Sequence, residues 1–345
     1  MTFTFSVHNV FNIKLTDMPE RIGCFLRREF SYFEIKELRK IDLEIKFVEK
    51  IKMPDNSTGL LNDFFYKNGI FYFNFRGSKL NIPIKDIENG EVVVFAEKTI
   101  EPLMIFYVIE KILHIKMIEK GFCFLHAAGA RLEGRTIIYS SLQGGGKTKW
   151  VLERIQEGAD YLSDELVLAD ELGSVFAYPR GMNIHSFHYE VYEKVLKKIP
   201  FNIRIRREFF LSCLKLARGL LKNNTGIGKK MDVLIKAKST FRLSVSELYE
   251  NIKIAAKSRL DKIIIGCVTK QGEDLSENWK VKRTVGFLVN NISNERLSFI
   301  APYLNAFFAY GDDYSTSFRK YLRKLTKKEL RILYRVVTKC KAGCL

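Results

Sequence analysis

Over the first hundred residues, apolar and polar positions alternate in short runs, which is the period expected of β-strands. Such runs cover residues 2–13, 43–51 and 91–96. Two aromatic runs within residues 64–75 are joined by Asn68-Gly69, a pair typical of a tight hairpin turn. We therefore expect a β-rich N-terminal domain built mostly of antiparallel strands.

The pattern changes to helical spacing at residues 101–120, where apolar positions run from Pro102 to Ile118 and Gly121 follows as a stop. We place a domain boundary near residue 100, which gives domains at residues 1–100 and 101–345. Beyond Gly121, strand and helix periods alternate, which predicts an α/β fold, α+β overall, with C-terminal helices.

In this second domain we expect a hairpin of strands at residues 122–132 and 135–141, turned at Glu133-Gly134. Further strands are expected at residues 161–168, 174–178 and 263–268. Helices are expected at residues 148–156, 189–198, 204–222 and 245–256 and over the last thirty residues. In the last helix, Thr326-Lys327-Lys328-Glu329 has the pattern of a capping box.

Composition narrows the class of protein. Hydrophobic residues make up 47% of the 345 residues, as in a globular chain. No apolar run reaches the roughly 18 residues of a membrane span, and no signal peptide pattern opens the chain. The six cysteines are scattered without paired spacing, which favours neither a zinc site nor a disulfide framework. A cytoplasmic location is the simplest expectation.

The net charge of +18 favours an anionic partner such as an acidic peptide. Nucleic acid is not expected, because no binding motif accompanies the charges. The alternative is that lysine-rich composition simply solvates two helices. The cations form two clusters: Arg204, Arg206, Arg207, Lys215, Arg218, Lys222, Lys229 and Lys230, and Arg319, Lys320, Arg323, Lys324, Lys327, Lys328, Arg331 and Arg335.

A glycine-rich loop follows the expected strand at 135–141 and precedes a helix, which is the order that a phosphate-binding loop requires. The candidate nucleotide-binding residues are Gly144, Gly145, Gly146, Lys147 and Thr148. Backbone amides at the start of a helix attract phosphate oxygens. Lys147 would reach the outer phosphates of ATP, and the Thr148 hydroxyl would bind Mg²⁺. Ser141 stands where this loop usually begins with glycine, a departure that matters if the backbone there has a positive φ.

Three further residue groups are candidates for catalysis. Asp164 and Glu165 follow an apolar strand, and two carboxylates there can divide proton acceptance and metal binding; the alternative is an acidic pair in an ordinary turn. His126 lies among small residues beside the loop strand, either near the phosphate or as a structural histidine. Arg180, in Tyr178-Pro179-Arg180-Gly181, suits stabilisation of a transferred phosphate, or is a surface arginine.

Across residues 121–190 these motifs resemble the catalytic domain of HPr kinase/phosphorylase, and more closely its shorter relatives encoded with ribosomally made peptides. The shared features are a histidine-bearing strand, the glycine-lysine-Ser/Thr loop, a helix ending at Gly158, the acidic pair and the Tyr-Pro-Arg segment. The resemblance implies that Asp164 is the general base, that Glu165 and Thr148 hold Mg²⁺, and that His126 lies beside the reacting groups. The family usually has aspartate where Glu165 stands.

The resulting hypothesis is an ATP- and Mg²⁺-dependent kinase that phosphorylates a hydroxyl, most simply a serine of an acidic peptide or small protein. Two alternatives stay open: a nucleotide-binding recognition protein with reduced catalysis, and a small-molecule kinase. Assembly into a homo-oligomer is compatible with all three functions.

Overall fold

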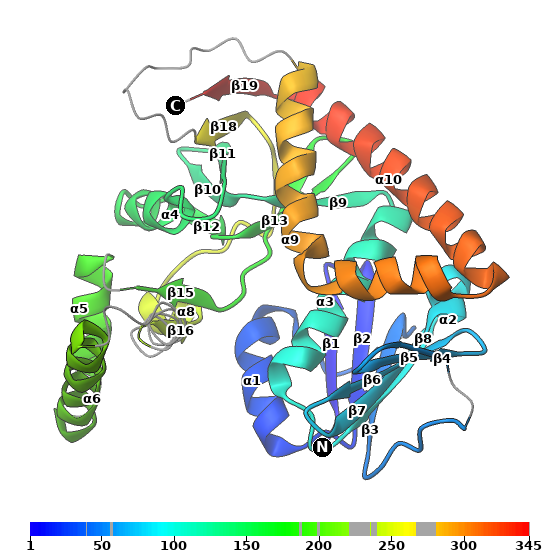
Figure 1. Cartoon of the computed structure of the whole chain (residues 1–345). Coiled ribbons are helices and arrows are strands. Elements are labelled where there is room, and N and C mark those ends of the chain that lie inside the picture. Colours follow the sequence, from blue (N-terminus) through cyan, green and yellow to red (C-terminus); the bar gives the residue numbers. More distant parts are fainter. Residues whose placement is uncertain are drawn as a thin grey trace. The chain divides into compact units, whose positions relative to one another are not determined.

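The computed structural model describes residues 1–38, 40–55, 58–185, 188–198, 201–220, 235, 240–266 and 281–344. These residues mix helices and strands in an α/β fold with a β-rich N-terminal region, as the sequence predicts (Figure 1). None of the helices within this part of the chain has the length and apolar character needed to cross a lipid bilayer.

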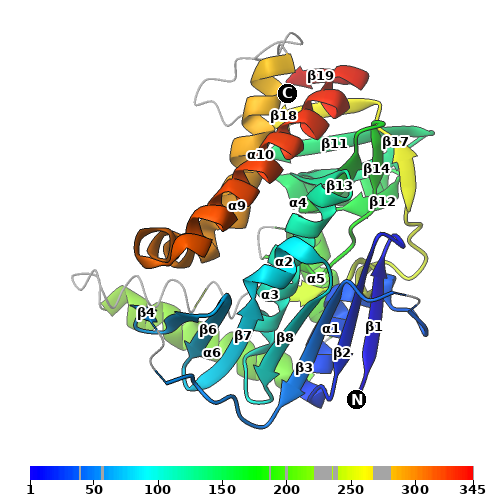
Figure 2. The same cartoon turned by 90° about the vertical axis from the view of Figure 1, so that its right-hand side faces the viewer.

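Eight strands of the N-terminal region form one mixed sheet (Figure 2). In sheet order they are β1 (Phe3–Val7), β2 (Phe11–Thr16), β3 (Leu43–Val48), β8 (Val92–Glu97), β7 (Ser78–Pro83), β6 (Ile70–Phe75), β5 (Phe64–Lys67) and β4 (Thr58–Leu61). The pairing is mostly antiparallel, as expected, but β2 with β3 and β3 with β8 pair in parallel. The single strand expected at residues 2–13 is wrong, because His8 and Asn9 take positive φ and turn the chain into a hairpin.

In the N-terminal region, one turn and one helix were predicted from the sequence, and one further helix was not. Asn68 and Gly69 form the expected turn, with φ of 51° and 80°, and the expected helix at residues 101–120 is α3 (Pro102–Glu119). Helix α1 (Glu20–Phe30) was not predicted, although Ile22, Leu26 and Phe30 recur at helical spacing and are buried. Two short helical segments, η1 (Ser31–Phe33) and α2 (Ile84–Asn89), complete the region.

The second sheet carries the glycine-rich loop. Its order is β12 (Asp160–Ser163), β10 (Ala128–Leu132), β11 (Arg135–Ser141), β18 (Lys262–Gly266) and β19 (Lys341–Cys344). The hairpin of β10 and β11 turns at Glu133-Gly134, as predicted. The expected strand at 263–268 is confirmed as β18 to Gly266, and its last two residues lie outside the described residues.

A third, antiparallel sheet has the order β17 (Lys257–Arg259), β14 (Ser174–Phe176), β13 (Leu166–Asp170) and β9 (Phe122–His126). Side chains alternate across it, so that Phe124 and Leu168 join one hydrophobic core while Leu125 and Val167 join another. This double burial explains why β13 is buried along its whole length.

Two strand predictions are wrong in an informative way. Residues 122–132 form two strands in different sheets, β9 and β10, separated at Ala127. Residues 161–168 likewise divide into β12 and β13, separated at Asp164 and Glu165. A continuous apolar run does not reveal these breaks, because strands on both sides of each break are buried.

The C-terminal part of the chain contributes the long helices α9 (Val281–Tyr310), which was not predicted, and α10 (Asp313–Lys339). The capping box expected at Thr326 is wrong: α10 begins after Asp312, whose side chain accepts a bond from the Tyr314 amide, and Thr326 lies inside the helix, bonded to the Leu322 carbonyl. The helix expected at 245–256 stops after one turn, α8 (Val245–Leu248).

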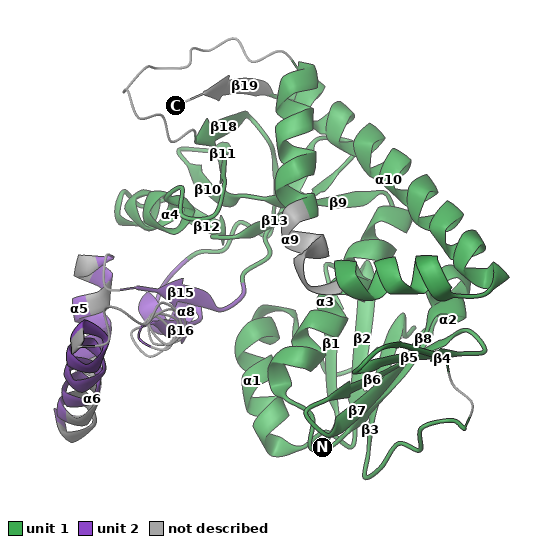
Figure 3. Cartoon of the chain, in the orientation of Figure 1, with its two compact units in different colours: residues 1–179, 253–345 green, residues 180–252 purple. Residues whose placement is uncertain are grey.

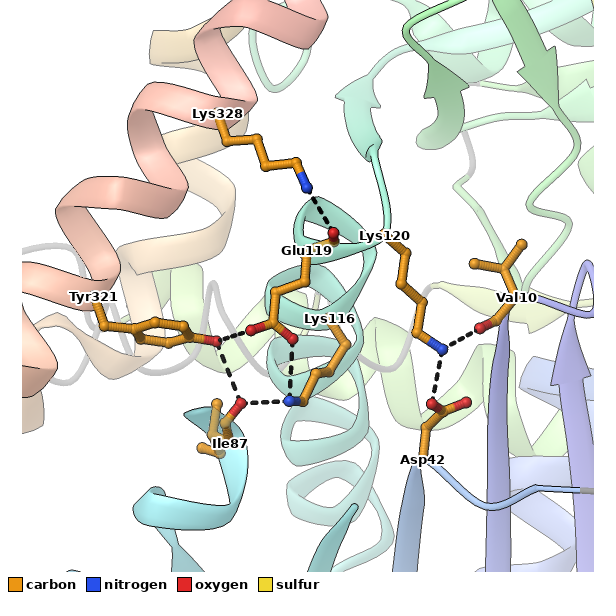
Figure 4. Close-up of polar contacts among 8 residues, drawn as sticks. All are labelled: Val10, Asp42, Ile87, Lys116, Glu119, Lys120, Tyr321 and Lys328. Atoms are coloured by element: carbon orange, nitrogen blue, oxygen red, sulfur yellow. Dashed lines mark hydrogen bonds and ion pairs between the residues drawn. The ribbon is translucent and has the colours of Figure 1, made fainter. Parts of the chain in front are cut away.

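A polar junction at the C-terminal end of α3 ties this helix to neighbouring elements (Figure 4). Lys116 is buried, bonds the carbonyl of Ile87 and lies 3.1 Å from a carboxylate oxygen of Glu119. Tyr321 of α10 donates to Glu119 at 2.8 Å, and Lys328 of the same helix donates to the Glu119 carbonyl at 2.6 Å. Burial, and then Glu119, raise the pKa of Tyr321, which keeps its hydroxyl a donor.

The chain divides into two compact units (Figure 3). The first comprises residues 1–179 and 253–345 and contains the three sheets described above; the second comprises residues 180–252. The second unit contains β15 (Met182–Ile184) paired with β16 (Phe241–Leu243), α8, α5 (Tyr189–Lys198) and α6 (Phe201–Leu220). The expected helices at 189–198 and 204–222 are thus confirmed within the described residues. The boundary expected near residue 100 stays a prediction.

Candidate functional site

The glycine-rich loop leaves the end of β11 and turns directly into α4 (Lys147–Gln156). Gly144 and Gly146 have φ of 80° and 84°, a region that side-chain-bearing residues rarely adopt. The amide of Gly145 bonds the Leu142 carbonyl at 3.0 Å, which curls the loop back on itself. α4 ends as the sequence predicts, with Gly158 at φ of 92° just beyond its last turn.

The middle glycine of the loop is required by packing. A Cβ at Gly145 would lie 2.6 Å from Cβ of Ser141, closer than real Cβ contacts. The Gly145 carbonyl accepts a bond from the Tyr139 hydroxyl at 2.9 Å, and the Tyr139 ring stacks on Trp150 with centroids 5.6 Å apart. Contacts of Tyr139 therefore connect β11 both to the loop and to α4.

Ser141 does not strain the loop. It ends β11 in register with Gly266 of β18 and has no positive φ, so the backbone at this position does not require glycine. The concern raised by its departure from the usual loop pattern is therefore removed at the level of local geometry.

Lys147 is the first residue of α4 and is buried. Its ammonium group donates to the carbonyls of Ser141 and Leu142, at 2.8 and 3.3 Å. The side chain thus folds over the loop at the helix N-terminus, where the peptide dipoles already favour an anion. Thr148, the next residue, is half-buried in the first turn of α4.

Strand direction brings the other candidates to the same edge of the sheet. β11 and β12 are both antiparallel to β10, which lies between them, so they run in the same direction and end at the same edge. The loop follows β11 at this edge, and Asp164 follows β12. β10 starts there, directly after His126 and Ala127. Ligands commonly bind at such carboxyl ends of parallel strands.

The acidic pair occupies the break between β12 and β13. Asp164 is 4% exposed, and the Tyr161 hydroxyl lies 3.4 Å from its Oδ1 atom. Glu165 is half-buried, and its carbonyl accepts a bond from the Ala127 amide at 2.9 Å. The Ser163 hydroxyl stabilises the backbone turn between β12 and β13. It donates to the Tyr178 carbonyl and accepts bonds from the amides of Glu165 and Leu166.

His126 belongs to β9, which pairs with β13, so the expectation that its strand pairs with the loop strand is wrong. It is nonetheless tied to the loop strand, because its carbonyl accepts a bond from the Ser140 hydroxyl at 2.8 Å. Its Nδ1 atom lies 3.0 Å from Oδ1 of Asn291. The imidazole is 5% exposed.

Asn291 is a candidate site residue that was not predicted from the sequence. Its amide nitrogen donates to the carbonyls of His126 and Ser141, at 3.2 and 3.0 Å, which fixes the amide orientation. Oδ1 can only accept, so His126 must carry its hydrogen on Nδ1. A signal was available: in α9, position 291 falls on the same helix face as buried Leu288 and Ile292, where a polar residue needs a partner.

Arg180 differs from the other candidates in its location. It is the first residue of the second compact unit, whereas the loop, the acidic pair, His126 and Asn291 belong to the first. Arg180 is buried. Its role at the site stays a prediction.

The arrangement as a whole places a glycine-rich loop that begins a helix and a carboxylate pair at the same sheet edge. Among the described residues, no three His, Cys, Asp or Glu side chains come together as a metal site. Neither models of known protein families nor curated proteins match this chain. The kinship expected from the motifs therefore stays a prediction.

Proposed function

We propose that this protein is an ATP- and Mg²⁺-dependent phosphotransferase that transfers the γ-phosphate to a hydroxyl, most simply to a serine of a peptide or small protein. The observation that carries the proposal is the shared sheet edge at which the Lys147 loop and Asp164 end two strands of the same direction.

The loop suits a nucleotide triphosphate. Its three glycines leave the backbone amides without covering side chains, and Lys147 supplies a positive charge at the start of α4. An ammonium group now bonded to two loop carbonyls can exchange them for phosphate oxygens of similar geometry. Loops of this kind bind the phosphates through backbone donors and the helix N-terminus.

The residues for Mg²⁺ are Thr148, in the first turn of α4, and Glu165, beside the Ala127 amide. Mg²⁺ in such sites needs only one or two protein oxygens besides the phosphates and water, so the absence of a larger acidic cluster among the described residues is compatible with it. When bound, the ion would neutralise charge on the phosphate oxygens.

The proposed reaction uses two side chains of the first compact unit. Asp164 accepts the proton of the attacking hydroxyl, which a buried carboxylate at the sheet edge can do. His126 pairs in register with Leu166, two residues beyond Asp164, and Asn291 orients it with its hydrogen on Nδ1, so it would steady the reacting groups. Arg180 belongs to the second compact unit, and its expected role in stabilising a transferred phosphate stays a prediction.

An acidic acceptor is supported by the outer face of α10. Five exposed cations follow one side of this helix, whereas of its two acidic residues Glu329 is buried and Asp313 lies in the first turn. They are Lys320, Arg323, Lys324, Lys327 and Arg331. Lys328 and Arg335 of the same cluster are engaged with Glu119 and Glu171. In the other cluster, Lys222, Lys229 and Lys230 lie outside the described residues.

Two variants test the proposal together. Lys147→Ala should weaken ATP binding in calorimetric titration with Mg²⁺, because it removes the charge facing the outer phosphates, while Lys149→Ala, an exposed lysine of the same helix, should not. Asp164→Asn should keep ATP affinity but lower transfer to a serine peptide by about 10²–10⁴-fold.

Unchanged ATP affinity in Lys147→Ala would remove the phosphate loop from consideration. ATP binding without transfer by the wild type would favour the recognition protein, and transfer only to small hydroxyl compounds the small-molecule kinase.

A further inference from the structure

A cavity of about 200 Å³ lies within the first compact unit, away from the glycine-rich loop. Its walls come from β6, β7, α2, α3, α9 and α10, coloured from blue to red in Figure 1. Apart from Lys111 and Thr326, the described lining residues are apolar or aromatic, among them Phe73, Val108 and Leu304. Cavities of about 150 Å³ with such walls stay dry and take up apolar molecules.

Of the two polar lining residues, Thr326 adjoins an exposed cation on the surface of α10. Thr326 is exposed on α10, and Arg323, one turn earlier, is its neighbour on the helix surface. Arg323 is exposed and has no hydrogen bond or ion pair with any other described residue. By contrast, Arg319, a turn further back, donates to the Phe308 carbonyl and lies over the Phe308 ring.

From this juxtaposition we propose that the cavity binds a single-chain anionic amphiphile. The hydrocarbon chain lies between α3 and the sheet, and the anionic head lies at the rim beside Thr326, held by Arg323. A guanidinium group pairs equally well with a carboxylate or a phosphate. The head is therefore that of a fatty acid or of a lysophospholipid. The cavity lining is separate from the residues proposed for phosphoryl transfer, whereas Arg323 also belongs to the basic face of α10 proposed for the acidic acceptor.

The chain offers a matched pair of charge variants. Arg323→Glu reverses the charge beside Thr326. Lys324→Glu makes the same change two residues from both Leu322 and Thr326, which puts it on the opposite side of α10 from the two lining residues. Both side chains are exposed, so neither variant should disturb folding. Val108→Phe fills the cavity from α3; should it fail to fold, Leu304→Phe, which is only half-buried, does so from α9.

Binding is measured by calorimetry and native mass spectrometry on the full chain, with octanoate, an octanoyl lysophosphatidate and octanol as probes, because an eight-carbon chain suits the size of the cavity. We expect saturable binding of at least one of the two anionic probes, and the probe that binds identifies the head. The cavity-filling variant and Arg323→Glu should each weaken this binding by about tenfold or more, and Lys324→Glu should leave it unchanged. Octanol binding should respond to the filled cavity but not to Arg323→Glu.

Several outcomes would overturn the proposal. Absence of saturable binding by the wild type would refute the site itself. Wild-type affinity in a folded cavity-filling variant would show that the chain binds elsewhere. An equal loss in Arg323→Glu and Lys324→Glu would mean general attraction to a basic surface, and binding only to anionic vesicles would indicate a membrane surface in place of a single ligand.

Discussion

Single residues decide the shape of the glycine-rich loop. Gly144 and Gly146 are needed for their backbone angles, but Gly145 is needed because Ser141 fills the space where its Cβ would be. Positions 141 and 145 are therefore coupled. A serine in place of the usual first glycine is compatible with the fold only if the middle of the loop has no side chain.

We predict that Gly145→Ala distorts the loop and weakens ATP binding, because the new methyl group meets Ser141 Cβ and Oγ at 2.6 Å. Ser141→Gly alone should have little effect, since Ser141 has no positive φ. Adding Ser141→Gly to Gly145→Ala should restore most of the lost affinity, with a coupling of about 0.5–3 kcal/mol. Titration of all four proteins with ATP measures it, and additive losses would contradict the coupling.

At the level of elements, the sequence predicts those turns, helices and strands whose conformation depends on neighbouring residues. The turns at Asn68-Gly69 and Glu133-Gly134, helix α3, and the strand, loop and helix around Lys147 were all found, because each depends on local backbone preferences. The breaks at Ala127 and at Asp164-Glu165 were missed, since they arise from pairing with strands distant in the chain.

The same limit applied to the site. The loop and the acidic pair each consist of consecutive residues, so both were recognised as candidates. Asn291 comes from a helix that was not predicted and is 165 residues from His126. Only the packing of α9 against β9 brings the two together. A polar residue on an apolar helix face is visible in the sequence only after the helix itself is recognised.

The junction at the end of α3 gives a prediction for element packing. Lys116→Met should lower the free energy of unfolding by about 1–3 kcal/mol, because Glu119 and the Ile87 carbonyl lose a buried donor. Lys98→Met is the matched control: its pair with Glu49 is exposed, so no measurable change is expected. Urea denaturation compares them, and equal stability of the two variants would mean that the junction does not support the packing of α3.

At the scale of the molecule, His8 links the N-terminal sheet to the strands near the acidic pair. It lies in the turn between β1 and β2, bonds the Ala177 carbonyl at 2.6 Å and packs against Tyr32, Phe33 and Phe176. Tyr178 follows Ala177 in the chain. Its amide donates to the Leu162 carbonyl, and its carbonyl accepts a bond from the Ser163 hydroxyl. Residues far apart in the sequence thus share one buried seam.

This contact should make stability depend on pH. Burial lowers the pKa of His8, against the opposing effect of the Ala177 bond. The unfolded chain therefore takes up a proton first as the pH falls through about 6.5, so stability is complete above this pH and declines below it. His8→Asn, which suits the positive φ of 52°, should flatten the decline by up to about 1.4 kcal/mol per pH unit. Identical slopes between pH 6.5 and 5 would exclude His8 as a source.

The overall charge of +18 makes a second prediction at this scale. If the cations of α10 bind an acidic acceptor, the KM for the peptide should rise steeply with salt, because exposed charges are screened within about 10 Å at 0.1 M. The KM for ATP should change much less, since Lys147 is buried. Steady-state kinetics with Lys320→Glu/Arg331→Glu should show the same selectivity. A peptide KM that responds neither to salt nor to these substitutions would assign the cations of α10 to solvation alone.

The stacked rings of Tyr139 and Trp150 also supply an optical signal. The Tyr139 hydroxyl bonds the Gly145 carbonyl, so any rearrangement of the loop on phosphate binding must disturb the environment of the indole one turn into α4. The chain has only two tryptophans, and the other is Trp279. In a Trp279→Phe protein, the emission of Trp150 alone would therefore follow the loop in real time, without a label and without knowledge of the acceptor.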